Sequence, residues 1–160
     1  MHADNVLAID HIAVAVKDLD AAVEWARAVL GCTLVDERDT HGKTSGMKSA
    51  VMRLGALTMV LVQGTGKNSH VCEFVEKHGA GVQHVALRVN DMGQAIDSLK
   101  ARHAQFATPL LRDGGLSQVF LMRDSATGVM LELIQRESEG AFSDANVTRL
   151  FESLESQQLY

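Results

Sequence analysis

The sequence predicts an α+β fold built from two β-α-β-β-β modules and a C-terminal helix. The chain contains an internal repeat, because residues 9–30 align with residues 82–103 without gaps. Each copy passes from an apolar strand-like segment into an amphipathic helix, and three short apolar runs follow each helix. A long period that occurs only twice indicates a duplicated module rather than a solenoid. We expect two such curled modules to form a half-open barrel.

The first module is expected to span about residues 8–64. It opens with the strand Ile9–Val16 and continues through Asp18, a residue type that caps helix N-termini. The helix that follows ends at Gly31, and glycine is common just past a helix C-terminus. Its apolar positions are Ala22, Val23, Ala26, Val29 and Leu30, and the predicted strands after it are Thr33–Asp36, Lys48–Leu54 and Leu57–Gln63.

The second module is expected to span about residues 81–136 and repeats this plan, with Asp91 at the start of its helix. A short helix, Val71–Lys77, connects the modules, and the tail from about 144 to 158 has the spacing of an amphipathic helix. We find no linker and expect one domain over residues 1–160. The predicted strands of this module are Val82–Val89, Thr108–Leu111, Gln118–Met122 and Val129–Gln135, and its helix has apolar positions at Met92, Ala95, Ile96 and Leu99.

The composition favours one globular core and excludes several partners. The chain has 160 residues, of which 46% are hydrophobic, and a net charge of −5. That charge argues against nucleic acid or an anionic membrane as a partner. There is neither an apolar run long enough to span a bilayer nor a signal peptide, so we expect a cytoplasmic protein. Cys32 and Cys72 form no metal-binding spacing and are expected to be buried thiols.

Three polar side chains stand in the middle of apolar strands, where a polar group is costly unless it is paired. His11 and His84 occupy equivalent places in the two repeats, so a pseudo-twofold axis would bring them together. Glu132 lies in the last strand of the second module, whereas the equivalent strand Leu57–Gln63 carries no His, Asp or Glu. Two histidines and one carboxylate with open positions are the ligand set of non-haem Fe(II) oxygenases. The sequence therefore predicts a catalytic metal site.

A single histidine in a strand is more often a hydrogen-bonded core residue than a metal ligand. The equivalence of His11 and His84 in the repeat, together with the strand-borne Glu132, favours a metal instead. His70, at the start of the connecting helix, is ambiguous. The remaining histidines lie in tails, loops or helix ends and are expected at the surface: His2, His41, His78 and His103.

Nearly the whole chain resembles one known family. The chain is similar to the vicinal oxygen chelate superfamily, and in particular to the catalytic C-terminal half of 4-hydroxyphenylpyruvate dioxygenase and 4-hydroxymandelate synthase. The stretches that carry this resemblance, in the family's order, are Ile9–His11, Ser45–Met52, Glu73–Leu87, Gln118–Phe120, Leu131–Arg136 and Gly140–Phe151.

The resemblance implies roles for particular residues. It implies that His11, His84 and Glu132 bind Fe(II). It also implies that Ser49, Gln63, Gln83 and Gln118 are polar contacts around the substrate, that Phe120 packs against a substrate ring, that His70 lines the pocket, and that Asn146 lies on a C-terminal lid helix. Of these, Ser49, Gln83 and Gln118 are the expected catalytic contacts.

Val147 stands where the family has a second aromatic that clamps the substrate ring. Its absence removes roughly 0.5–1.5 kcal/mol of stacking. The sequence therefore favours a 2-oxo acid other than 4-hydroxyphenylpyruvate, either aliphatic or differently substituted.

Three functional hypotheses follow. The leading one is an Fe(II)-dependent dioxygenase that uses O2 to decarboxylate and hydroxylate a 2-oxo acid. The second is a redox-silent enzyme with Co(II), Mn(II) or Zn(II), either a methylmalonyl-CoA epimerase-like isomerase or a glyoxalase-like lyase, in which Glu37 or Asp39 would supply a base. The third is a binding protein of the bleomycin-resistance type, which needs no intact metal triad. Exposed sheet edges lead us to expect a homodimer.

Overall fold

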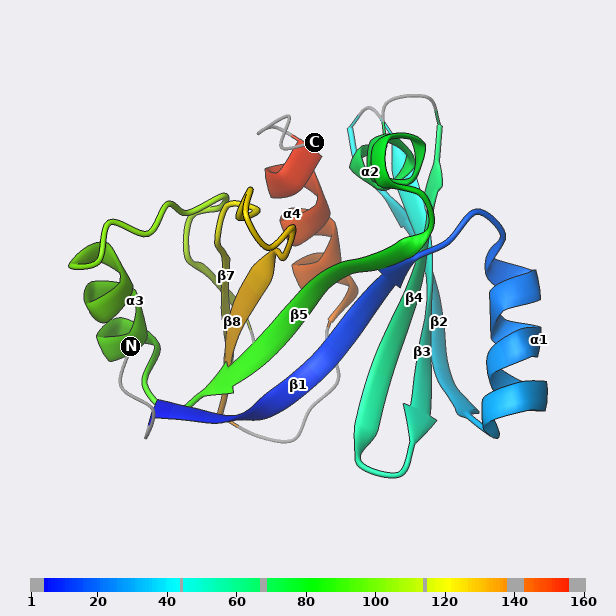
Figure 1. The fold of residues 1–160 in the computed structure, drawn as a ribbon, viewed down its shortest axis with the longest axis horizontal. Coiled ribbons are helices and arrows are strands. Elements are labelled where there is room, and N and C mark those ends of the chain that lie inside the picture. The colour runs from blue at the N-terminus through cyan, green and yellow to red at the C-terminus, as the bar shows by residue number, and fades with distance from the viewer. Residues whose placement is uncertain (1–4, 44, 67–68, 114, 138–142, 156–160) are drawn as a thin grey trace. The chain divides into compact units, whose positions relative to one another are not determined.

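The computed structural model describes the whole chain except residues 1–4, 44, 67–68, 114, 138–142 and 156–160 (Figure 1). The described residues form eight strands and four helices. Their order is β1 (Val6–Ala15), α1 (Leu19–Leu30), β2 (Thr33–His41), β3 (Gly46–Leu54), β4 (Leu57–Thr65), α2 (His70–His78), β5 (Gly81–Val89), α3 (Met92–Lys100), β6 (Leu111–Asp113), β7 (Leu116–Phe120), β8 (Leu131–Arg136) and α4 (Asp144–Glu155).

The strands follow the order β2-β3-β4-β1-β5-β8-β7-β6 in one sheet. The chain divides into two compact units, and the boundary falls within β1. The N-terminal unit consists of residues 11–83, and the C-terminal unit consists of residues 84–159 together with the residues up to Asp10. Strand β1 therefore gives its first half to the C-terminal unit and its second half to the N-terminal unit.

In the N-terminal unit, β2, β3 and β4 are antiparallel neighbours, and β4 pairs in parallel with β1. Helix α1 covers one face of these strands (Figure 1). Helix α2 covers the opposite face. The α1 core contains Leu19, Val23, Ala26, Ala50, Met52 and Leu61, and the α2 core contains Ala15, Val62, Val71 and Phe74.

The C-terminal unit repeats this plan. Strand β5 pairs in parallel with β8, and β8, β7 and β6 are antiparallel neighbours. Helix α3 packs on one face, and a smaller apolar cluster lies on the other. The α3 core contains Val89, Met92, Ala95, Val119 and Leu133, and the smaller cluster contains Ala86, Leu116 and Ile134.

The two helices α1 and α3 begin in the same way, which supports the duplication. Asp18 accepts a hydrogen bond from the Ala21 amide and Asp91 accepts one from the Gln94 amide, each at 2.9 Å. These bonds satisfy amides that have no partner within the helix.

A glutamine side chain from the last strand of each module also reaches the first turn of its helix. Gln63 Oε1 accepts from the Leu19 amide at 2.7 Å, and Gln135 Oε1 accepts from the Met92 amide at 2.8 Å. The last strand and the helix of each module are thus joined at the same point.

The structure confirms the predicted α+β class and the two β-α-β-β-β modules followed by a C-terminal helix. The predicted strand Thr108–Leu111 is wrong in position, because the strand there is Leu111–Asp113. Pro109 has no amide hydrogen to donate to a ladder. The chain before Pro109 makes an isolated bridge instead, between Phe106 and Leu121.

Strand β2 is longer than predicted and continues to His41 through a charged stretch. A register shift between Leu34 and Asp36 marks a bulge early in the strand. That both modules belong to one domain of residues 1–160 stays a prediction.

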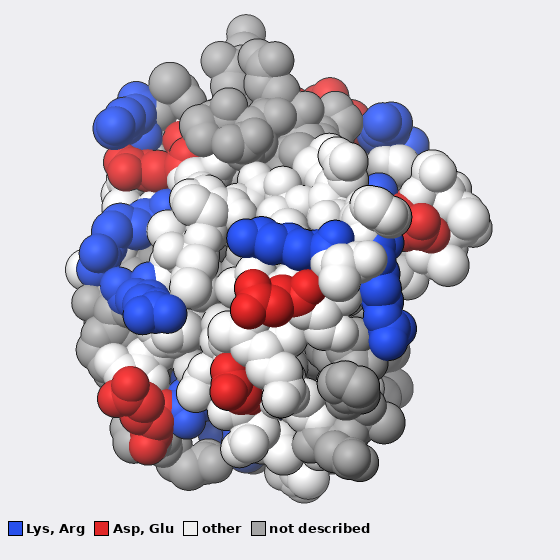
Figure 2. Space-filling view, turned by 90° about the vertical axis from the view of Figure 1, so that its left-hand side faces the viewer, with Lys and Arg blue, Asp and Glu red and all other residues white. Residues whose placement is uncertain are grey.

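No helix in the part of the chain that the structure describes is both long and apolar enough to cross a membrane. On the face drawn in Figure 2, lysine and arginine side chains are interspersed with aspartate and glutamate among uncharged surface. Among the described residues drawn there, the two signs of charge alternate instead of gathering in separate patches.

Candidate metal centre

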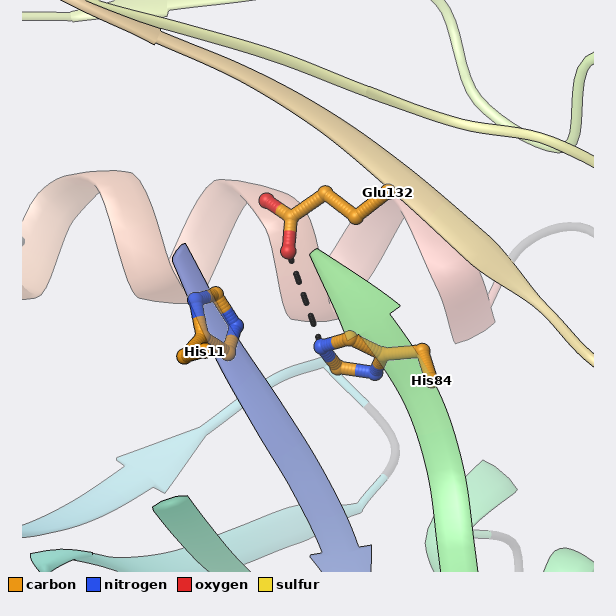
Figure 3. Close-up of side chains that lie close together, drawn as sticks. All are labelled: His11, His84 and Glu132. Atoms are coloured by element: carbon orange, nitrogen blue, oxygen red, sulfur yellow. Dashed lines mark ion pairs between the residues drawn. The ribbon is translucent and has the colours of Figure 1, made fainter. Parts of the chain in front are cut away.

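Within the C-terminal unit, His84 and Glu132 lie next to each other on neighbouring strands. Ala86 of β5 is in register with Glu132 of β8, and His84 lies two residues before Ala86, so the side chains of all three share a face. His84 Nε2 lies 3.5 Å from Glu132 Oε2 (Figure 3). Two ligands 2.0–2.2 Å from one ion lie about 3.0–3.4 Å apart, so this pair is close to metal-binding geometry without rearrangement.

His11 comes from β1 and is 5% exposed. It directly follows Asp10, whose carboxylate binds Arg88 of β5 and Arg136 of β8. The backbone just before His11 is therefore tied to the two strands that carry the other candidate ligands. One ligand atom each from His11, His84 and Glu132 lies within 4.8 Å of the others, and the three side chains point toward one another (Figure 3).

These donors fit a divalent transition metal. The group offers two imidazole nitrogens and one carboxylate oxygen, and Glu132 is 1% exposed. A buried carboxylate is costly unless it is paired with positive charge or binds a metal. Imidazole suits iron, zinc, copper and nickel, and two histidines with one carboxylate form the facial arrangement that leaves positions open. The structure therefore holds a possible metal site at the three residues that the sequence predicted.

The equivalent of Glu132 in the first module is Val60. Ala13 pairs with Val60 in the first module as Ala86 pairs with Glu132 in the second. By strand alternation, the side chain of His11 lies on the same face as Ala13 and Val60. A valine cannot bind a metal, so duplication supplies no fourth protein ligand at this place.

Ser49 lies on the same face of the N-terminal unit as Val60. It is 6% exposed and pairs with Val62, which packs with α2. Glu37 and Asp39 lie on the opposite face, because Glu37 pairs with Ala50 of the α1 core. Both acids are exposed there. The suggestion that either of them supplies a base beside His11 is therefore not supported by their position.

Several predicted substrate contacts lie beside the pair of ligands in the C-terminal unit. Phe120 pairs with Glu132 across β7 and β8, and its ring meets the His84 ring edge-on with 5.0 Å between centroids. Gln118 lies two residues before Phe120, on the same face of the strand. The structure buries both side chains completely, with 0% exposure. Phe120 thus lies beside two candidate metal ligands, and its contact with a substrate ring, like that of Gln118 with the substrate, stays a prediction.

The other predicted contacts differ in their surroundings. Gln83 directly precedes His84 and is 3% exposed. Gln63 uses its side-chain oxygen to hold the Leu19 amide at the start of α1, and strand alternation puts it on the face of Leu61 in the α1 core, opposite Val60 and His11. Its position therefore does not support the predicted substrate contact. Val147 is half-buried in α4, and the side chain of Asn146 lies outside what the structure describes.

His70 begins α2 and is 5% exposed. Burial lowers the pKa of His70 to about 4, because the charged imidazolium loses its hydration in this environment. The side chain is therefore a neutral imidazole at physiological pH, able both to donate and to accept a hydrogen bond.

Sequence reasoning missed the cluster formed by Asp10, Arg88 and Arg136. Two signals could have revealed it. Asp10 is a charged residue in an otherwise apolar strand, and each arginine follows a predicted ligand by four residues, at 84 and 88 and at 132 and 136. Sequence reasoning also missed that Gln63 and Gln135 are equivalent residues that bind helix termini.

Fold and side chains together define a class of protein: a duplicated β-α-β-β-β chain with candidate metal ligands on the first strand of each module and the last strand of the second. The family described as the Glyoxalase/Bleomycin resistance protein/Dioxygenase superfamily matches residues 10–120. The chain belongs to this superfamily, which confirms the resemblance predicted from the sequence.

Relatives with two different activities match the chain. It is 28% identical over 157 residues to 4-hydroxyphenylpyruvate dioxygenase of Pseudomonas aeruginosa, an alignment that covers 76% of this chain and 43% of that protein. It is 26% identical over 134 residues to mitochondrial methylmalonyl-CoA epimerase of Homo sapiens, covering 82% of this chain and 75% of that protein. The chain thus spans less than half the length of the dioxygenase.

A solved structure shows the same fold over almost the entire chain. A mutant of 4-hydroxymandelate synthase from Streptomyces coelicolor superposes with a TM-score of 0.84 at 23% identity. The superposition covers 96% of this chain and 55% of that one.

Proposed function

We propose that this protein is an Fe(II)-dependent dioxygenase that decarboxylates and hydroxylates a 2-oxo acid. One observation carries the proposal. The candidate ligand set consists of His11, His84 and Glu132, and Val60 stands where duplication would have put a fourth ligand. Three protein ligands leave room for both a chelating substrate and O2, whereas a closed ligand set does not.

In this proposal, His11, His84 and Glu132 hold the iron. The bound iron supplies the one-electron chemistry with O2 that side chains cannot perform. The original carboxylate of the substrate leaves as CO2. One oxygen atom of O2 joins the former keto carbon, which becomes the carboxylate of the product, and the other becomes the new hydroxyl group. The four electrons come from the substrate itself, so no outside reductant is required.

The protein's own residues would bind and orient the 2-oxo acid. Gln118 offers a buried amide group on the face of β7 that carries Phe120, the neighbour of His84, and Ser49 offers a hydroxyl from the face that carries His11. Strand alternation puts the side chain of Gln83 on the face opposite His84, so Gln83 would act from behind the strand. Amides do not titrate near neutral pH, so they orient a substrate and are poor general bases. Phe120 packs beside His84 and excludes water from that side.

The substrate side chain would meet His70, Val147 and Asn146. His70 is neutral, which suits a polar but uncharged substrate group. Val147 offers an aliphatic contact in place of a ring, so we propose an aliphatic or differently substituted 2-oxo acid rather than 4-hydroxyphenylpyruvate.

A second candidate function is a redox-silent isomerase. The similarity to methylmalonyl-CoA epimerase favours it, because this chain covers 75% of the human enzyme. Such a reaction needs a base beside the metal, and Glu37 and Asp39 lie on the α1 face rather than on the face of His11. We therefore place it second.

The test measures oxygen uptake and CO2 release after anaerobic loading with Fe(II), across a panel of aliphatic and aromatic 2-oxo acids. We expect uptake with at least one acid, and at least a hundredfold loss in His84→Ala and Glu132→Ala. His41→Ala, at an exposed histidine, serves as the matched control and should keep full activity.

Two results would count against the dioxygenase. Absence of uptake with every acid, combined with epimerisation of methylmalonyl-CoA by the Co(II) form under nitrogen, would establish the second candidate. Ligand binding that survives both His84→Ala and Glu132→Ala would instead indicate a binding protein of the bleomycin-resistance type.

The homodimer and the cytoplasmic location stay predictions. Light scattering of the purified protein tests the homodimer.

A further inference from the structure

A buried ionic cluster lies beside the candidate metal ligands in the C-terminal unit. The Asp10 side chain is only 4% exposed. Its carboxylate accepts two hydrogen bonds from Arg136, one from Nε at 3.0 Å and one from a terminal nitrogen at 3.0 Å. Arg88 donates from Nε at 3.0 Å and also places a terminal nitrogen 2.9 Å from the same oxygen. Both arginines therefore hold one carboxylate through charge-assisted bonds.

The position of the cluster in the three strands suggests its role. Asp10 directly precedes His11 in β1, Arg88 follows His84 by four residues in β5, and Arg136 follows Glu132 by four residues in β8. Each member of the cluster thus belongs to the same strand as one candidate ligand. Bonds between the members fix how far each strand slides along its neighbours, and hence the relative heights of the ligands.

The first module lacks an equivalent cluster, which separates a role at the metal from a general role in the fold. The pairing of the strands makes Gln83 the equivalent of Asp10, Ala15 the equivalent of Arg88, and Gly64 the equivalent of Arg136. None of these three residues is charged. An ion cluster that the β-α-β-β-β module needed for folding would be expected in both copies, whereas this one occurs only in the copy that supplies Glu132.

We propose that Asp10 is a positioning residue for the metal ligands. Through Arg88 and Arg136, it sets the height of the β1 backbone at His11 relative to the strands of His84 and Glu132. This inference rests on the proposed function, because it assumes that the three side chains bind a metal. It assigns Asp10 no contact with metal or substrate.

The test uses Co(II) as the probe and measures its dissociation constant and its visible absorption spectrum, which reports ligand geometry. We expect Asp10→Asn to weaken Co(II) binding at least tenfold and to change the intensity of the absorption bands. Arg136→Lys keeps the charge but loses the two-pronged contact, and should show a smaller change in the same direction. Asp10→Glu, which keeps the carboxylate, should recover part of the affinity.

Two controls separate positioning from stability. Met92→Ala removes a buried side chain from the α3 core and should lower the melting temperature while Co(II) affinity stays within twofold. Asp97→Asn removes an exposed carboxylate from α3 and should change neither property.

Each unfavourable outcome has a distinct meaning. If the wild-type protein binds no Co(II), the proposed metal site fails and the positioning role fails with it. If the wild type binds Co(II), and Asp10→Asn and Arg136→Lys bind it with unchanged affinity and spectrum, the cluster is only structural. If Asp10→Asn does not fold, Arg136→Lys and Asp10→Glu decide the question by the same two measurements.

Discussion

Individual buried polar residues serve two different purposes in this protein. Gln63 and Gln135 hold the amides of helix termini, and Asp10 holds two arginines. His70 and Gln118 are also buried, and the resemblance implies that each contacts a substrate, which stays a prediction. Residue type alone could not distinguish these purposes, because an amide in a strand can cap a helix or bind a ligand.

His70 gives a prediction about pH. Its pKa is lowered to about 4 by burial, so the unfolded chain takes up a proton below pH 6.5 while the folded chain stays neutral until about pH 4. Stability is therefore lost progressively as the pH falls from 6.5 to 4, by on the order of 3 kcal/mol in total. We expect His70→Gln to remove this loss, measured as the free energy of unfolding in urea at pH 7 and pH 4.5.

The control for this experiment is His41→Gln. The His41 side chain is 76% exposed, so its replacement should leave the wild-type dependence on pH in place. A His70→Gln protein that loses as much stability on acidification as the wild type would show that burial of this imidazole is not the cause.

At the scale of elements, the internal repeat was the most informative signal in the sequence. It predicted both modules, the equivalence of His11 and His84, and the aspartates that start α1 and α3. The ends of strands were harder to predict, because they depend on neighbours that are distant in sequence. The end of β2 is an example, since its charged residues pair with β3 along the whole strand.

The register of the repeat gives a second prediction, for Val60. A glutamate at position 60 would occupy the same place in the strand register relative to His11 as Glu132 occupies relative to His84. We expect Val60→Glu to bind Co(II) at least tenfold more tightly and to lose at least tenfold in oxygen uptake, because a fourth protein ligand would occupy a position that the substrate or O2 needs.

Val60→Leu is the matched control, since it adds bulk to the same site without adding an oxygen donor. It should leave Co(II) affinity near that of the wild type. Equal Co(II) affinity in Val60→Glu and the wild type would show that position 60 does not face the metal.

At the scale of the whole chain, family membership is established, but the activity is a proposal. The superfamily match covers residues 10–120, and the relatives include both a dioxygenase and an epimerase. The sequence predicted the three candidate ligands because they interrupt apolar strands. It offered only indirect signals of the Asp10 cluster, because the pairing of Asp10 with Arg88 and Arg136 joins three strands that are distant in sequence.

Metal binding should be visible in the stability of the whole chain. A ligand that binds only the folded state at one hundred times its dissociation constant stabilises by about 2.7 kcal/mol. For a chain of this length, that corresponds to a rise in melting temperature of roughly 5–10 °C. We expect this difference between thermal unfolding in excess Co(II) and in EDTA.

The double variant His84→Ala with Glu132→Ala serves as the control for that measurement. It should melt at one temperature in both solutions. A wild-type melting temperature that is the same with Co(II) and with EDTA would contradict the metal site.

The parallel pairing of β1 with β4 and of β5 with β8 also constrains how the chain folds. The paired residues are 47 positions apart for β1 and β4 and 46 for β5 and β8, so nearly a whole module must close into a loop before either pairing gains a contact. Local hairpins and helices have no such delay. We therefore expect Glu132 to meet His84 only when its module closes, so that a nascent chain acquires its metal-binding geometry late in folding.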